Sequence, residues 1–162
     1  MKILAGLFLV FGLLACNPSE NKTKHLQNRI DSLEVKLANA YKPGFGEFMS
    51  NIQTHHIKLW FAGENENWEL ANFEIHEIME TFEDIEKYET DRPERKLIGM
   101  INPALDSVNN AIEAKDAEQF KKSFSSLTVT CNQCHQAADF GFNVVKIPDK
   151  QPFSNQEFKI QQ

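Results

Sequence analysis

Two cysteines and a histidine lie within five residues, CNQCH, at positions 131 to 135 of a 162-residue chain. Cys131 and Cys134 are three positions apart, and His135 follows directly. On a helix these spacings bring all three side chains to one face. Two thiols placed in this way can bond to neighbouring substituents at one edge of a macrocycle, and the imidazole can turn back to meet a metal at the centre of the ring. The motif therefore predicts a covalently held metal macrocycle.

The pattern C-x-x-C-H is the attachment site of c-type haem, in which the final histidine is the proximal ligand. We expect one covalent haem c, held by Cys131 and Cys134 and ligated by His135. Three alternatives compete with this interpretation. A structural zinc would need a fourth ligand, and the sequence has no second cysteine pair. A thioredoxin-like dithiol would need a βαβ context, and a disulfide fits positions i and i+3 of a helix poorly.

The N-terminus predicts export, which agrees with haem attachment outside the cytoplasm. Lys2 precedes an apolar run over residues 3–14, a pattern typical of a secretory signal and too short for a comfortable membrane span. The sequence LLAC, which ends at Cys16, resembles the lipobox of bacterial lipoproteins. This resemblance implies a signal peptide over 1–15, a lipid on Cys16 and a location in the cell envelope or periplasm. An ordinary cleaved signal is the alternative.

The charge balance narrows the set of partners. The chain has 17 Lys and Arg against 23 Asp and Glu, which gives a net charge of −6. Because no basic patch stands out, we expect no nucleic-acid partner. Membrane contact should come from the lipid on Cys16, since acidic surfaces are not attracted to anionic headgroups. In an oxidising compartment, cysteines pair, bind a cofactor or are modified.

The segment after the predicted signal peptide is expected to separate Cys16 from the main domain. Residues 16–24 are polar and predict a flexible tether, and residues 25–42 predict a helical stalk. The apolar residues of this stalk recur at spacings of four, three and four: Leu26, Ile30, Leu33 and Leu37. This short heptad seam over 26–37 could pair with a second copy of the chain or pack on the main domain.

Residues 43–162 predict four further helical stretches and a tail. The stretches cover about 45–61, 67–85, a third from Pro93 and a fourth from Asp116 to near Gly141. Pro103 should break or kink the third stretch, with a fresh cap at Asn102. Because no alternating run is long enough for a sheet, we expect an all-α fold. Its form would be an antiparallel four-helix bundle with an extra N-terminal helix and an extended C-terminal tail.

The predicted bundle and the motif together resemble the class II c-type cytochromes, the cytochrome c′ type. The resemblance covers about residues 43 to 142, at the level of architecture and of Cys131, Cys134 and His135. The stretches HHIKLWFAGENENWELANFE and PFSNQEF are also similar to those of a group of small bacterial haem-domain proteins. The cytochrome c′ family often leaves the iron without a sixth ligand and has little sequence after the haem helix. The longer tail of this chain departs from that pattern.

The sixth ligand could come from five side chains: Met49, His55, His56, His76 and Met79. A rotation of about 100° per residue places His56 near the centre of the apolar face of the first predicted helix and His55 at the edge of that face. On the second predicted helix, His76 lies opposite the apolar stripe. We expect His56 as the distal ligand, with Met49 as the runner-up. The alternative role for His56 is a hydrogen bond to a neighbouring helix or to a haem propionate. Trp60 and Phe124 should pack around the macrocycle or fill the core.

The function that these residues predict is an electron carrier rather than an enzyme, which works with a redox partner protein. A gas-binding or sensing haem protein with an open distal site is the main alternative, and an accessory haem subunit of a larger complex is a third. A run of glutamates on the second stretch should be mostly a solvated helix face: Glu74, Glu77, Glu80, Glu83 and Glu86.

Overall fold

The computed structural model describes residues 18–38, 40 and 43–160 of the chain. The chain divides into two units, Met1–Tyr41 and Lys42–Gln162, which we describe separately. Within the described residues the fold is all-α, with five α-helices, one 3-10 helix and no strand. The predicted signal peptide and the predicted lipidation site at Cys16 lie outside the described residues.

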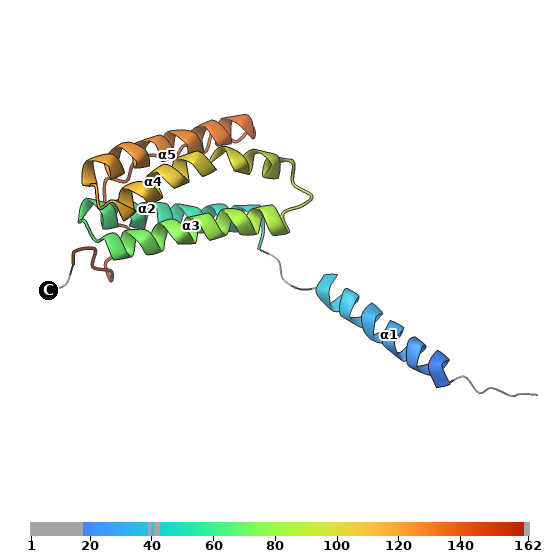
Figure 1. Ribbon diagram of the computed structural model, residues 1–162. Coiled ribbons are helices and arrows are strands. Elements are labelled where there is room, and N and C mark those ends of the chain that lie inside the picture. The colour runs from blue at the N-terminus through green and yellow to red at the C-terminus, as the bar shows by residue number, and fades with distance from the viewer. Residues whose placement is uncertain (1–17, 39, 41–42, 161–162) are drawn as a thin grey trace, which may run out of the picture. The chain divides into compact units, whose positions relative to one another are not determined.

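The first unit contains helix α1, which spans Pro18–Ala38 (Figure 1). It begins inside the segment predicted to be a tether. Proline is well tolerated in the first turn of a helix, and Glu20 favours the positive N-terminal end. The four apolar residues of the predicted seam are between 47% and 68% exposed: Leu26, Ile30, Leu33 and Leu37. Among the described helices, none combines the length and the apolar character needed to cross a bilayer.

In the second unit, α2 (Phe45–Glu64) and α3 (Trp68–Tyr88) pack extensively on each other. At the start of α2, the Gly44 amide donates a hydrogen bond to the Glu47 carboxylate at 2.9 Å. Asn67 caps α3 by accepting from the Leu70 amide at 3.3 Å, which confirms the predicted start. Both helices run three residues beyond their predicted ends.

The third helical stretch is broken, as its proline predicts. A 3-10 helix, η1, spans Pro93–Met100, and α4 spans Asn102–Glu113. Pro103 lies in the first turn of α4, where an amide hydrogen would have no partner within the helix. The cap position is occupied by Ile101, not by Asn102 as the sequence indicated.

The last helix, α5, spans Ala117–Ala137 and carries the CNQCH motif near its C-terminal end. Asp116 caps it by accepting from the Gln119 amide at 2.9 Å, as predicted. The helix ends before Gly141 because Asp139 adopts a left-handed φ of 63°. The Phe140 amide then donates back to the His135 carbonyl at 2.7 Å. Glycine usually provides such an ending, but aspartate tolerates the conformation.

Helices α2 to α5 run alongside one another (Figure 1). The contacts link α2 with α3, α3 with α4, α4 with α5, and α5 with α2. Fully buried side chains from all four helices share one core, among them Leu59, Ile75, Val108 and Phe124. At Gly63 the backbone of α2 comes very close to α5, because a Cβ atom there would lie 2.1 Å from the ring of Phe120.

The tail after α5 has no regular secondary structure, but it packs against the helices. Phe158 is fully buried, and its ring centroid lies 5.7 Å from that of Phe61. The Asn67 side chain donates to the Phe158 carbonyl at 3.2 Å. Earlier in the tail, the Lys58 ammonium lies over the ring of Phe153, 5.4 Å from its centroid. Phe158 therefore joins the core, which the lack of periodicity in the tail does not predict.

Candidate functional site

The two cysteines of the motif are free thiols on a partly buried side of α5. Cys131 packs against the hydrophobic core. The Sγ atom of Cys134 lies 4.0 Å from the carbonyl oxygen of Leu97 in η1, which is a weak contact. The sulfur atoms are not bonded to each other, so the disulfide alternative is not realised in this structure.

Burial raises the pKa of both thiols. For Cys131, burial is the main cause and the neighbouring Cys134 adds to it, so that the pKa rises to about 12. Burial also raises the pKa of Cys134, which is less enclosed. Redox-active dithiols have a cysteine of lowered pKa, which supplies the attacking thiolate. The raised pKa of both thiols therefore disfavours the thioredoxin-like alternative.

The imidazole of His135 is oriented by the tail. Its Nδ1 lies 2.6 Å from the carbonyl oxygen of Asn143. A carbonyl only accepts, so Nδ1 carries the proton and Nε2 keeps its lone pair. Metal-binding histidines usually donate their other N–H to a carbonyl or carboxylate in this way. His135 is therefore in the tautomer that a proximal ligand through Nε2 requires.

Asn132, the first residue between the two cysteines, also contacts the tail. Its amide donates to the carbonyls of Thr128 at 3.0 Å and of Val145 at 2.8 Å. It accepts a hydrogen bond from the Val145 amide at 2.8 Å. Sequence reasoning missed this residue, because the two middle positions of C-x-x-C-H carry no signal of their own.

Two contacts define the register between α2 and α5. The backbone of Gly63 lies against the ring of Phe120, and His56 pairs with Thr128. Moving back along α2 therefore corresponds to moving forward along α5, and the two helices are antiparallel.

The same register places the two candidate distal ligands at different levels. Met49 precedes His56 by seven residues, so it reaches the level of Cys134 and His135 on α5. His56 lies about 10 Å further along the helix axis, at about 1.5 Å per residue. Met49 is partly buried and packs against the core. Met49 is therefore level with the His135 end of the motif, whereas His56 is level with Thr128, about one helical turn before Cys131.

His56 is buried and already has a hydrogen-bond partner on α5. The Thr128 hydroxyl donates to the Phe124 carbonyl at 3.0 Å, so its oxygen accepts from Nε2–H of His56 at 3.1 Å. The His56 ring also lies 4.5 Å from that of Phe124, and burial lowers the His56 pKa to about 4. This arrangement is the helix-to-helix hydrogen bond that the sequence left open as an alternative to iron ligation.

Trp60 and Phe124, which were expected around the macrocycle or in the core, pack near His56 between α2 and α5. The Trp60 ring centroid lies 4.9 Å from that of Phe124 and 6.3 Å from that of Phe120. Phe124 is fully buried and precedes Cys131 by seven residues, which is about two turns of helix. Along α5, Phe124 therefore lies about 10 Å from the first cysteine, and Thr128, the partner of His56, lies about 4.5 Å from it.

A second buried polar cluster joins α2 and α3. His55 Nδ1 donates to the Glu74 carboxylate at 2.6 Å, and the Lys58 ammonium lies 3.9 Å from the same carboxylate. Glu74 is only 1% exposed, so its predicted place on a solvated face is wrong. Its charge is accommodated because it is paired on α2. His76 is exposed, as predicted, and contacts the Asn72 carbonyl of its own helix at 2.7 Å.

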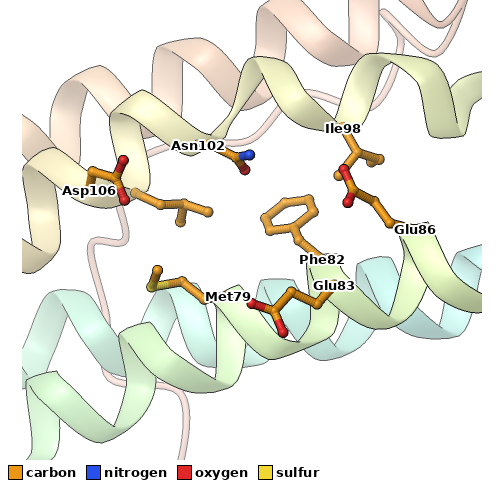
Figure 2. Close-up of a pocket in the computed structure, with 8 residues that line it drawn as sticks. Met79, Phe82, Glu83, Glu86, Ile98, Asn102 and Asp106 are labelled. Atoms are coloured by element: carbon orange, nitrogen blue, oxygen red, sulfur yellow. The ribbon is translucent and has the colours of Figure 1, made fainter.

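A pocket of about 320 Å³ opens between α3 and the η1–α4 segment (Figure 2). Figure 2 shows Met79 and Phe82 of α3 pointing toward α4, with Glu83 and Glu86 beside them. Ile98 lines the other side, next to the residue whose carbonyl contacts Cys134. The carboxylates disfavour an anionic ligand here, so the pocket does not suit the propionate edge of a haem.

The zinc alternative gains no support from the geometry. Among the residues that the structure describes, no three His, Cys, Asp or Glu side chains are grouped so that they could hold a metal ion. Comparison with models of protein families, with curated proteins and with solved structures finds no match to this chain. The argument for function therefore depends on the motif and its surroundings.

Proposed function

We propose that this chain is an exported monohaem c-type cytochrome that carries single electrons. The observation that carries the proposal is the motif itself: two free thiols one helical turn apart, followed by a histidine whose Nδ1–H is already donated to a carbonyl. We further propose that α2 to α5 form an antiparallel four-helix bundle of the class II kind. A lipid on Cys16 would hold the protein in the cell envelope, where it meets a redox partner protein.

The side chains of the motif fit a covalent haem c. Thioether attachment needs thiols that are not paired with each other, and no disulfide joins Cys131 to Cys134 on α5. Nε2 of His135 has the lone pair that an axial ligand needs. When bound, haem supplies a one-electron couple whose potential depends on its axial ligands and its surroundings. The chain contributes two covalent attachment points and one oriented imidazole.

Within this proposal, the register favours Met49 over His56 as the distal ligand. Met49 is level with His135, whereas His56 lies about 10 Å from that level along the helix axis and its Nε2–H is donated to Thr128. A methionine–histidine pair would give a higher potential than two histidines.

The hydrogen bond between His56 and Thr128 also supports a second candidate function. If neither Met49 nor His56 ligates the metal, the distal side stays open to small ligands. The protein would then be a gas-binding or sensing haem protein of the cytochrome c′ kind.

Covalent attachment is tested by expressing the chain together with a c-type haem maturation system. Wild-type protein should keep haem-dependent peroxidase staining on a denaturing gel, and the double variant Cys131→Ala, Cys134→Ala should lose it. Cys16→Ser is the matched control, since it removes the third cysteine of the chain and should keep the stain. If haem from wild type extracts freely into acidified organic solvent, the proposal is wrong.

Absorption spectra of the oxidised and reduced protein separate the two candidate functions. An electron carrier with two axial ligands should be low-spin and bind carbon monoxide slowly or not at all. Met49→Ala should then turn the spectrum high-spin and make carbon monoxide binding fast, while His56→Ala keeps it low-spin. The reverse result would assign the ligand to His56. A high-spin wild type that binds carbon monoxide rapidly would instead support the gas-binding function.

A further inference from the structure

The segment 143–145 of the tail lies along the motif end of α5 and is held there by Asn132. The Asn132 amide uses both of its N–H groups and its oxygen: it donates to Thr128 within α5 and exchanges two hydrogen bonds with the backbone of Val145. Because the bond to Thr128 fixes the side chain on its own helix, the two bonds to Val145 fix the tail relative to that helix.

The contact between the tail and His135 is only two residues away from this attachment. The Asn143 carbonyl accepts from His135 Nδ1 at 2.6 Å, and the Asn143 amide donates to the Phe140 carbonyl at 2.8 Å. The backbone at Asn143 is therefore held on one side by the turn after α5 and on the other by Val145. Its carbonyl has little freedom to leave the imidazole.

We propose that Asn132 is a positioning residue for His135 and acts through the tail. It holds the Asn143 carbonyl against Nδ1–H and so keeps the imidazole plane and the Nε2 lone pair in place for the iron. This inference rests on the proposed function. A hydrogen bond from Nδ1–H makes the imidazole a more basic ligand. A more basic ligand stabilises the oxidised iron more than the reduced iron, so the bond lowers the reduction potential.

The far end of the tail is attached independently, which makes the role of Asn132 separable. Phe158 is buried beside Phe61, and its carbonyl accepts from Asn67. Loss of the Asn132 bonds therefore frees only the part of the tail near His135 and leaves the core contact of Phe158 intact. A merely structural role for Asn132 would lower stability without changing the electronic properties of the ligand.

The test compares the two middle residues of the motif in full-length, haem-loaded protein. Asn132→Ala should raise the midpoint potential and should speed solvent exchange of the His135 Nδ1 proton, followed by NMR in the reduced state, by about tenfold. Gln133→Ala is the matched control, because the Gln133 side chain is exposed, and it should keep both wild-type values. Val145→Pro removes the amide hydrogen that Asn132 accepts, and it should shift both quantities in the same direction as Asn132→Ala.

The outcomes separate this inference from the proposed function. If wild type, Asn132→Ala and Gln133→Ala all hold haem but share one potential and one exchange rate, the positioning role is overturned and the cytochrome proposal stands. If wild type holds no covalent haem, both the proposed function and this inference are wrong. If Asn132→Ala does not fold, as judged by its helical circular dichroism, Val145→Pro decides the question by the same two measurements.

Discussion

Cys131 and Cys134 belong to one motif, but their thiols are not equally buried. Burial raises the pKa of Cys131 to about 12, and it raises that of Cys134, which is less enclosed. Because the thiolate is the reactive form, we predict that iodoacetamide labels the haem-free chain at Cys134 first and at Cys131 much more slowly. Peptide mass spectrometry after timed labelling at about pH 8 measures both rates.

Two controls accompany the labelling experiment. In denaturant the two cysteines should react at similar rates, since burial no longer separates them. In haem-loaded protein neither should react, because both sulfur atoms are then in thioether bonds. Equal rates in the folded, haem-free chain would contradict the difference in burial described above.

Burial also keeps the imidazole of His56 neutral, with consequences for stability in acid. Its pKa falls from 6.5 to about 4. The unfolded chain binds a proton at this residue near pH 6.5, whereas the folded chain binds it only near pH 4, so acid favours unfolding between these values. The loss is absent above pH 6.5 and reaches about 3 kcal/mol near pH 4. We predict that His56→Gln removes this part of the pH dependence.

Urea unfolding at a series of pH values measures the effect on the free energy of unfolding. Glutamine can still donate a hydrogen bond toward Thr128, so the variant mainly removes the titration. His76→Gln is the control, because His76 is exposed and should leave the wild-type slope unchanged. Parallel curves for wild type and His56→Gln would contradict a lowered His56 pKa.

At the scale of the helices, the starts of α3 and α5 were predictable because their capping is local. Asn67 and Asp116 stand just before periodic apolar stretches, and both accept the expected backbone hydrogen bond. The end of α5 was not predictable, since aspartate at position 139 takes the left-handed conformation that usually marks glycine. The burial of Glu74 depends on partners on another helix, which no local pattern reveals.

In the candidate site, too, the features that depend on adjacent residues were predictable, and the contacts between distant residues were not. The motif at 131–135 was recognisable because its chemistry is contained in five adjacent residues. The partners of His135 and Asn132 lie in the tail at Asn143 and Val145, and the partner of His56 lies on α5. These contacts follow from how the tail and helices pack, so the sequence alone left the tail without a role and the distal ligand open.

The tail makes a testable contribution to the stability of the second unit. Phe158 is fully buried, so we predict that Phe158→Ala lowers the free energy of unfolding by about 3–5 kcal/mol, through lost burial and the cavity left behind. Phe142→Ala is the matched control in the same tail. Its side chain is 81% exposed, and its loss should change stability by less than about 0.5 kcal/mol. Similar midpoints for both variants in urea would show that the tail is not part of the core.

At the scale of the whole molecule, the negative net charge opposes binding to an anionic membrane, whereas the predicted lipid on Cys16 favours it. Cleavage before Cys16 would remove Lys2 and leave 16 basic against 23 acidic residues, a charge of −7. A net negative charge of this size does not favour binding to anionic headgroups. If the protein is anchored as proposed, we expect its membrane binding to come mainly from apolar contact, which acyl chains on Cys16 would provide.

Cys16→Ser tests this expectation directly. Each buried methylene of an acyl chain contributes about 0.8 kcal/mol to membrane binding, so loss of the lipid should move the protein from the membrane fraction to the soluble fraction. A high-salt wash should not release wild type, because the interaction is apolar rather than electrostatic. Cys131→Ala with Cys134→Ala is the control and should stay with the membrane. A Cys16→Ser protein that remains in the membrane fraction would refute the lipid anchor. The exposed apolar stripe of α1, which includes Leu26 and Leu33, would then be the candidate for membrane contact.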